Sequence, residues 1–162
     1  MGESDVVIKH PNRDKAGSKA TRAGVILLLL VSTGLFLVVT IGGWSALVGA
    51  QFLQIAYILI YLLMAFYVAR WNRGVLPVAA ALAIIMLIFA AVATPAWFAR
   101  DKTGFTDPAL PAEFLGLITA IIIPVQVLLL VFSMRGFQQA WNVEVEHYSD
   151  GSSNADTIVA RA

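Results

Sequence analysis

Three long stretches of this chain contain no side chain that is charged near neutral pH. No Asp, Glu, Lys, Arg or His occurs in residues 23–69, 74–99 or 114–134. The hydrocarbon core of a bilayer is about 30 Å thick and needs about 20 apolar residues at the helical rise. The second and third stretches are therefore one span each, and the first is long enough for two. The pattern predicts an all-α integral membrane protein built as a bundle of four transmembrane helices.

The first stretch has to be divided between two helices. Gly42-Gly43 is the only glycine pair in the chain, and we interpret it as the break. The four spans are then expected at about 23–41, 48–69, 75–98 and 113–135. An alternative interpretation makes the first span a signal peptide that is cleaved after residue 50. The polar leader before it and the length of the apolar run favour an uncleaved anchor.

The transmembrane domain, 23–141, is flanked by two polar segments. Residues 1–22 are basic, and we expect them to form a flexible segment that lies against anionic lipid. The C-terminal tail is 142–162, and its first residues, 142–148, alternate between apolar and polar side chains. This alternation predicts either a short strand that docks on a partner or a frayed acidic helix end. Residues 149–162 are expected to be disordered.

The loop cations predict the orientation in the membrane. They are concentrated before the first span (Lys9, Arg13, Lys15, Lys19, Arg22), between spans two and three (Arg70, Arg73) and at the end of span four (Arg135). The connection between spans one and two has no charge, and acidic residues offset Arg100 and Lys102 in the connection 100–112. Since cytoplasmic loops are enriched in Lys and Arg, both termini are expected to be cytoplasmic. Compact loops and the lack of organelle signals favour a bacterial-type plasma membrane.

Each of the four tryptophans lies at or just beyond the end of a predicted span. Tryptophan prefers the membrane–water interface because its ring is largely apolar while its N–H requires a polar partner. We therefore predict four interface anchors, with Trp44 and Trp97 on the outer side and Trp71 and Trp141 on the inner side.

Small residues recur at helical spacing on the last two spans. They give a smooth face to span three (Ala79, Ala83, Ala90, Thr94) and to span four (Gly116, Ala120). In lipid, close backbone approach through such faces favours helix association. These residues are predicted to form a helix-packing face, within the monomer rather than between subunits.

Polar side chains inside the spans are the main candidates for a functional surface. Gln51, Gln54, Tyr57 and Tyr61 fall on one side of span two and would form a polar stripe in the outer half of the bilayer. The stripe serves either interhelical hydrogen bonding or the lining of a hydrated cavity. Gln126 follows Pro124 in the centre of span four. Proline lacks an N–H, so we expect a kink there, with Gln126 bonding a backbone group of a neighbouring helix.

The missing residue types argue against catalysis. The sequence has no cysteine, and both histidines lie outside the predicted spans, so no haem, metal or other cofactor site is expected. Proton-coupled transporters generally carry a buried Asp, Glu or His, which these spans lack. A net charge of +1 predicts no nucleic-acid partner. We therefore expect no enzymatic activity.

Two functions remain open. The first is a non-catalytic structural or accessory subunit of a larger membrane protein complex, of the respiratory or cell-envelope kind. The second is an oligomeric channel or facilitator for a neutral or weakly charged solute, lined by the stripe on span two. The expected partners are membrane lipids and other membrane protein subunits or further copies of the chain. The connection 100–112 is the candidate extracytoplasmic contact.

Overall fold

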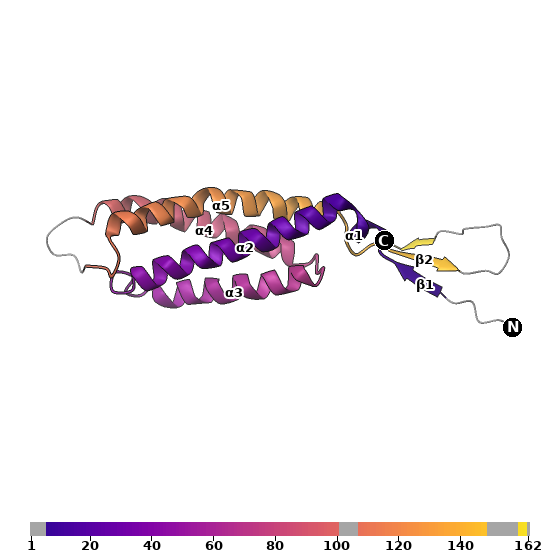
Figure 1. The fold of residues 1–162 in the computed structure, drawn as a ribbon, viewed down its shortest axis with the longest axis horizontal. Coiled ribbons are helices and arrows are strands. Elements are labelled where there is room, and N and C mark those ends of the chain that lie inside the picture. Colours follow the sequence, from indigo (N-terminus) through magenta and orange to yellow (C-terminus); the bar gives the residue numbers. More distant parts are fainter. Residues whose placement is uncertain (1–5, 101–106, 149–158, 162) are drawn as a thin grey trace.

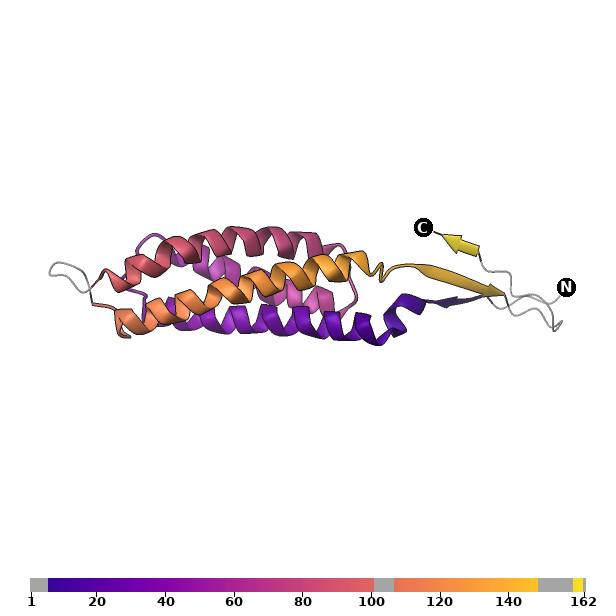
Figure 2. The same cartoon turned by 90° about the horizontal axis from the view of Figure 1, so that it is seen from above.

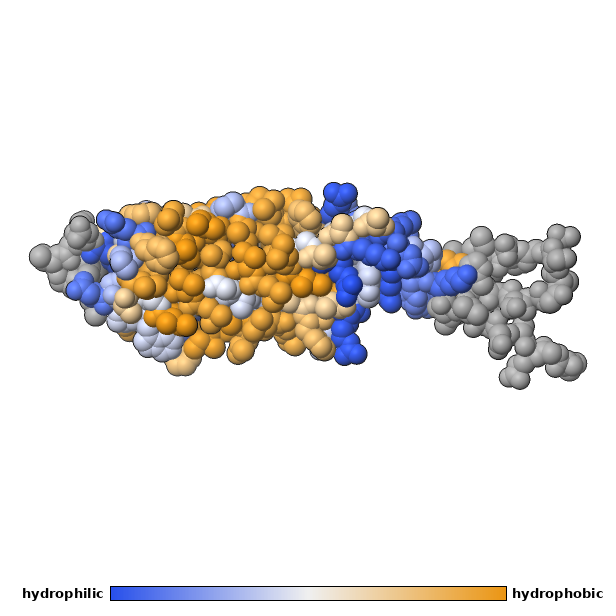
Figure 3. All heavy atoms as spheres, viewed as in Figure 1, coloured by the Kyte–Doolittle hydropathy of each residue, from blue (hydrophilic) through white to orange (hydrophobic). Residues whose placement is uncertain are grey.

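Four long helices dominate the computed structural model of the chain, which describes residues 6–100, 107–148 and 159–161. They are α2 (Ala16–Gly42), α3 (Gln51–Ala69), α4 (Val75–Phe98) and α5 (Ala112–Gln138) (Figure 1). Each is long and apolar enough to cross a membrane. An apolar surface covers the middle of the bundle, and hydrophilic residues gather at its ends (Figure 3). The predicted four-helix membrane bundle is confirmed.

The helices run up and down the bundle and form a ring that is open on one side. α5 packs extensively on α4 and also on α2, and α2 packs on α3, whereas α3 and α4 make few contacts with each other. We call the end where α2 begins and α5 ends the terminal end, and the opposite end the loop end (Figures 1 and 2). An apolar cavity lies on the open side of the ring, between α3 and α4.

The helix ends differ from the predicted span ends where charged residues continue a helix. α2 starts at Ala16, well before the predicted boundary at residue 23, because no proline or glycine pair interrupts residues 16–22 and their cations lie at the membrane edge. The predicted break is confirmed, since α2 ends at Gly42. The turn to α3 uses Gly49 at φ +88°, a backbone conformation that glycine adopts at no steric cost. α5 is continuous through Pro124.

A small antiparallel sheet lies beyond the terminal end of the bundle (Figure 2). Its order is β1 (Val6–Lys9), β2 (Glu144–Tyr148) and β3 (Val159–Arg161), with Val6 opposite Tyr148. Of the two predictions for residues 142–148, the strand is confirmed over 144–148 and pairs with the chain's own N-terminal segment, whereas its docking on a partner stays a prediction. The expectation that residues 1–22 are flexible is wrong for residues 6–22. The expected disorder of 149–162 lies outside the described residues except for β3.

The sheet is connected to the bundle by side chains of the short helix α1 (Pro11–Asp14). The Asn12 amide donates to the carbonyl of Ala140 at 3.0 Å, and Arg13 Nε donates to the carbonyl of Trp141 at 3.1 Å. Next to them, His10 Nε2 lies 3.3 Å from Glu144 Oε1. These contacts hold the segment before α2 against the segment after α5.

Candidate functional site

Three polar side chains meet in the centre of the bundle. The Tyr61 hydroxyl donates to Gln126 Oε1 at 2.8 Å, and Gln126 Nε2 donates to Ser32 Oγ at 2.9 Å. Ser32 in turn donates to the carbonyl of Leu28 at 2.7 Å. All three side chains are fully buried. This central network (Ser32, Tyr61, Gln126) connects α2, α3 and α5 and satisfies polar groups that lipid could not.

The network differs from the sequence prediction in its partners. Gln126 was expected to bond a backbone group of a neighbouring helix, but it bonds two side chains instead. Ser32 was not predicted as a partner, because one serine within a nearly continuous apolar run carries no periodic signal. Its position on the buried side of α2 becomes visible only when α5 is placed beside it.

Aromatic rings fill the space between α2 and α3 next to this network. The ring centroid of Phe36 lies 6.1 Å from that of Tyr57 and 5.5 Å from that of Tyr61, and the two tyrosines are 5.7 Å apart. Tyr57 and Tyr61 are both buried. These two members of the predicted stripe therefore pack inside the monomer.

The other two members of the stripe lie nearer the loop end and are separate from the network. Gln51 is partly exposed and donates from Nε2 to the carbonyl of Trp44 at 3.0 Å. Gln54 lines a cavity, and its buried Oε1 atom has no hydrogen-bond partner among the described residues. The structure thus divides the stripe into a buried aromatic pair and two glutamines with different surroundings.

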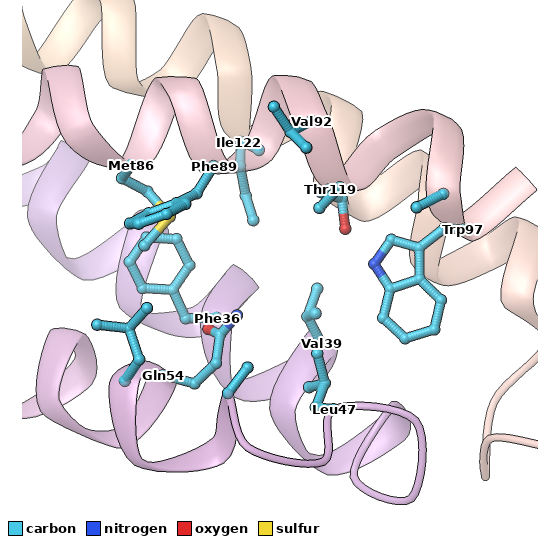
Figure 4. A pocket seen from close by; sticks show the side chains of 15 residues that line it. Phe36, Val39, Leu47, Gln54, Met86, Phe89, Val92, Trp97, Thr119 and Ile122 are labelled. Carbon is cyan, nitrogen blue, oxygen red and sulfur yellow. The ribbon is translucent and has the colours of Figure 1, made fainter. Parts of the chain in front are cut away.

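The cavity lined by Gln54 has a volume of about 290 Å³ and lies between α3 and α4 (Figure 4). Its lining is almost entirely apolar, and residues of α2 and α5 form its inner wall, including Val39 and Ile122. Apart from Gln54, the polar groups that line it are the Thr119 hydroxyl and the Trp97 indole. Thr119 donates to the carbonyl of Leu115 at 2.7 Å. We call this space the lateral cavity.

Two tryptophans pack against each other at the terminal end of the bundle. Trp71 and Trp141 pack edge to face, with ring centroids 5.4 Å apart and an interplanar angle of 86°. The Arg22 guanidinium lies 4.4 Å from the Trp71 ring centroid and donates to the carbonyls of Val68 and Ala69 at the end of α3. A cation near the C-terminus of a helix is favourable both for the helix dipole and for its unpaired carbonyls.

Trp71 itself has an unusual backbone conformation, with φ +61°. Its N–H bonds the carbonyl of Val68, and the N–H of Asn72 bonds that of Tyr67. This pair of bonds is the Schellman termination, in which a glycine normally occupies the left-handed position. The edge-to-face contact with Trp141 and the contact with Arg22 hold a tryptophan there instead.

The four tryptophans do not share one environment. Trp44 is half exposed and Trp71 partly buried, whereas Trp97 and Trp141 are buried. All four lie at helix ends, as expected, but Trp97 and Trp141 face protein. The Arg100 guanidinium lies 5.3 Å from the Trp97 ring and donates to the carbonyl of Ala46 at 3.3 Å, at the loop end.

The small residues of span three lie inside the bundle. Ala79, Ala83 and Ala90 are buried, and Thr94, partly buried, donates to the carbonyl of Ala90 at 2.7 Å. On α5, Gly116 is covered by the Phe98 ring of α4, so that a Cβ atom there would come within 3.1 Å of the ring. Ala120 is partly buried one turn further along. These positions accompany the extensive packing of α4 on α5.

The central network and the lateral cavity contain neutral polar groups only. Within residues 6–100, 107–148 and 159–161, no three His, Asp or Glu side chains come together as metal ligands would. The arrangement can donate and accept hydrogen bonds and can accommodate apolar groups. Neither a known protein family, nor a curated protein, nor a solved structure matches this chain.

Proposed function

We propose that this chain is a non-catalytic structural or accessory subunit of a larger membrane protein complex, of the respiratory or cell-envelope kind. The observation that carries the proposal is the sheet β1–β2–β3, which extends beyond the helices (Figure 1). A sheet buries its hydrophobic face against another layer, and a small sheet without such a layer has little stability of its own. None of the four long helices packs extensively on the described part of this sheet. A partner protein would supply the missing layer.

The central network supports the same function. Its hydroxyl and amide groups bond one another, and no ionised group takes part. Such a network holds three helices in register and pairs its own polar groups with one another. This use of the buried polar residues suits a scaffold better than an active site.

The proposed location is a bacterial-type plasma membrane, with both termini cytoplasmic. The terminal end of the bundle carries most of the cations near the spans, including Arg22, Arg70, Arg73 and Arg135, whereas the described part of the loop end carries Arg100. Hydrophilic residues form a broad band at the terminal end (Figure 3). Because Lys and Arg are enriched on the cytoplasmic side, this asymmetry supports a cytoplasmic terminal end.

Disrupting the sheet tests the subunit proposal. Val145 pairs with Lys9 on one side and with Ala160 on the other, so Val145→Pro removes an N–H from the central strand. We expect the wild-type chain, extracted with its lipid by a membrane-solubilising polymer, to co-purify stoichiometrically with another membrane protein. Val145→Pro should reduce that yield about tenfold or more, as quantified by mass spectrometry.

Val145→Thr is the matched control, because threonine also favours strands and keeps its N–H. It should retain the partner, and circular dichroism should give the same helix content for both variants. A wild-type chain that elutes alone, or a partner that remains bound to Val145→Pro, would contradict the proposal.

The channel function is the alternative, and it now depends on Gln51 and Gln54 alone, because the tyrosines of the stripe are buried. On the subunit proposal, liposomes that contain only this chain take up a neutral solute such as glycerol no faster than protein-free liposomes. Uptake that is fast in the wild type, unchanged in Gln138→Leu and lost in Gln51→Leu/Gln54→Leu would establish the channel instead. Gln138 is a suitable control because it is exposed on α5.

A further inference from the structure

The lateral cavity opens toward the lipid. Leu53 of α3 and Phe89 and Val92 of α4 line it and are also exposed on the outside of the bundle, Val92 at 70%. The opening lies where α3 and α4 make few contacts. A molecule dissolved in the membrane can therefore enter from the side without passing through water.

The length of the cavity along α4 matches the thickness of one leaflet of a bilayer. Along α4 its lining runs from Met86 to Trp97, which at 1.5 Å per residue is about 16 Å. The hydrocarbon core is about 30 Å thick, so one leaflet contributes about 15 Å. Its volume of about 290 Å³ exceeds that of an apolar cavity of about 150 Å³ that binds benzene. The space suits an extended chain better than a compact ring.

The polar side chains Gln54 and Trp97 lie at different depths of the cavity. Its deep end is lined by Met86, Phe36 and Ile122, with Gln54 beside Phe36, whereas Trp97 lies toward the loop end (Figure 4). Gln54 Oε1 is buried and has no hydrogen-bond partner among the described residues. Figure 4 shows the Trp97 indole nitrogen directed toward the cavity. A donor thus lies at the depth where a lipid chain joins its headgroup, and the acceptor lies deeper in the cavity.

We propose that the lateral cavity binds one hydrocarbon chain of a membrane lipid. The chain lies along α4 toward Met86, and an ester carbonyl of the lipid accepts from the Trp97 indole. This arrangement gives the Trp97 N–H an acceptor and fills an apolar space that water would not occupy. The site is independent of the sheet and of any protein partner.

Photolabelling in a bilayer tests the site directly. The full-length protein is placed in nanodiscs of phosphatidylglycerol that contains a trace of the same lipid with a diazirine at one acyl-chain end. After illumination, peptide mapping should find the label concentrated near Met86 and Ile122. A second lipid, with the diazirine next to the ester, should label near Leu47 and Trp97 instead.

Filling the cavity should abolish this labelling. Ala93 lines the cavity, and we expect Ala93→Trp to lower the label at these sites about tenfold or more. Ala91→Trp is the matched control, because Ala91 is exposed on the same helix and does not line the cavity. Ala93→Leu fills less space and should give a partial decrease, which keeps the test valid if Ala93→Trp does not fold.

Three outcomes would overturn the proposal. The label could spread evenly over the lipid-facing residues of all four helices, or it could persist in both Ala93 variants. Diazirine-labelled glycerol could also label these sites where the lipid probes do not, which would indicate a hydrated space. Because the assay uses the isolated chain, its failure and the failure of the subunit proposal are distinguishable.

Discussion

Replacing Trp141 with alanine is expected to lower the free energy of unfolding by about 3–5 kcal/mol, the range for removing a buried large aromatic side chain. Trp141 is fully buried, packs edge to face on Trp71 and donates from Nε1 to Gln139 Oε1 at 3.0 Å. Its loss also removes the ring that holds Trp71 in its left-handed conformation. Equilibrium unfolding by SDS in mixed micelles, followed by circular dichroism, measures the change.

Trp44→Ala is the control for this experiment, since Trp44 is 50% exposed at the loop end. It should change the free energy of unfolding by about 1 kcal/mol or less, as is usual for exposed positions. Equal effects of the two substitutions would mean that Trp141 serves only as an interface anchor. The contact between Trp71 and Trp141 would then contribute nothing to the stability of the terminal end.

Replacing Gln126 with alanine is expected to cost about 2–4 kcal/mol, because it combines the loss of buried volume with the loss of two hydrogen bonds. The hydroxyl of Tyr61 is left without its acceptor, and Ser32 loses the amide that donates to it. The same SDS unfolding titration measures the effect. Gln138→Ala, at an exposed position of the same helix, should be nearly neutral.

A double-mutant cycle isolates the hydrogen bond within this effect. Tyr61→Phe removes only the hydroxyl, and its coupling to Gln126→Ala should be about 0.6 kcal/mol and at most about 1.7 kcal/mol, the mean and the maximum of double-mutant cycles between membrane helices. Additive effects of the two substitutions would contradict the bond between Tyr61 and Gln126. The destabilisation by Gln126→Ala would then come from packing alone.

The four helices could be predicted because the bilayer imposes a length and a polarity that charge-free stretches report directly. The start of α2 could not, because Lys19 and Arg22 were interpreted as the end of the apolar run rather than as part of the helix. Their long side chains reach the membrane edge while the backbone remains helical. Hydropathy therefore locates the membrane better than it locates the ends of helices.

The partners within the site depend on helix order, which sequence periodicity does not contain. Gln126 was identified as a polar group in need of a partner, but its partners Ser32 and Tyr61 follow from how α2, α3 and α5 are arranged in the bundle. The lateral cavity depends on the opposite feature, the sparse contact between α3 and α4. Both result from how four similar apolar surfaces arrange themselves in three dimensions.

The pairing of β1 with β2 sets an order on the biogenesis of this protein. Val6 leaves the ribosome roughly 140 residues before its partner Tyr148, a delay of about 7–30 s at synthesis rates of 5–20 residues per second. The two strands reach the same side of the membrane only after an even number of crossings, which the four helices together provide. Formation of the sheet thus marks the completion of insertion, and a chain that lost one helix would leave β1 without its partner.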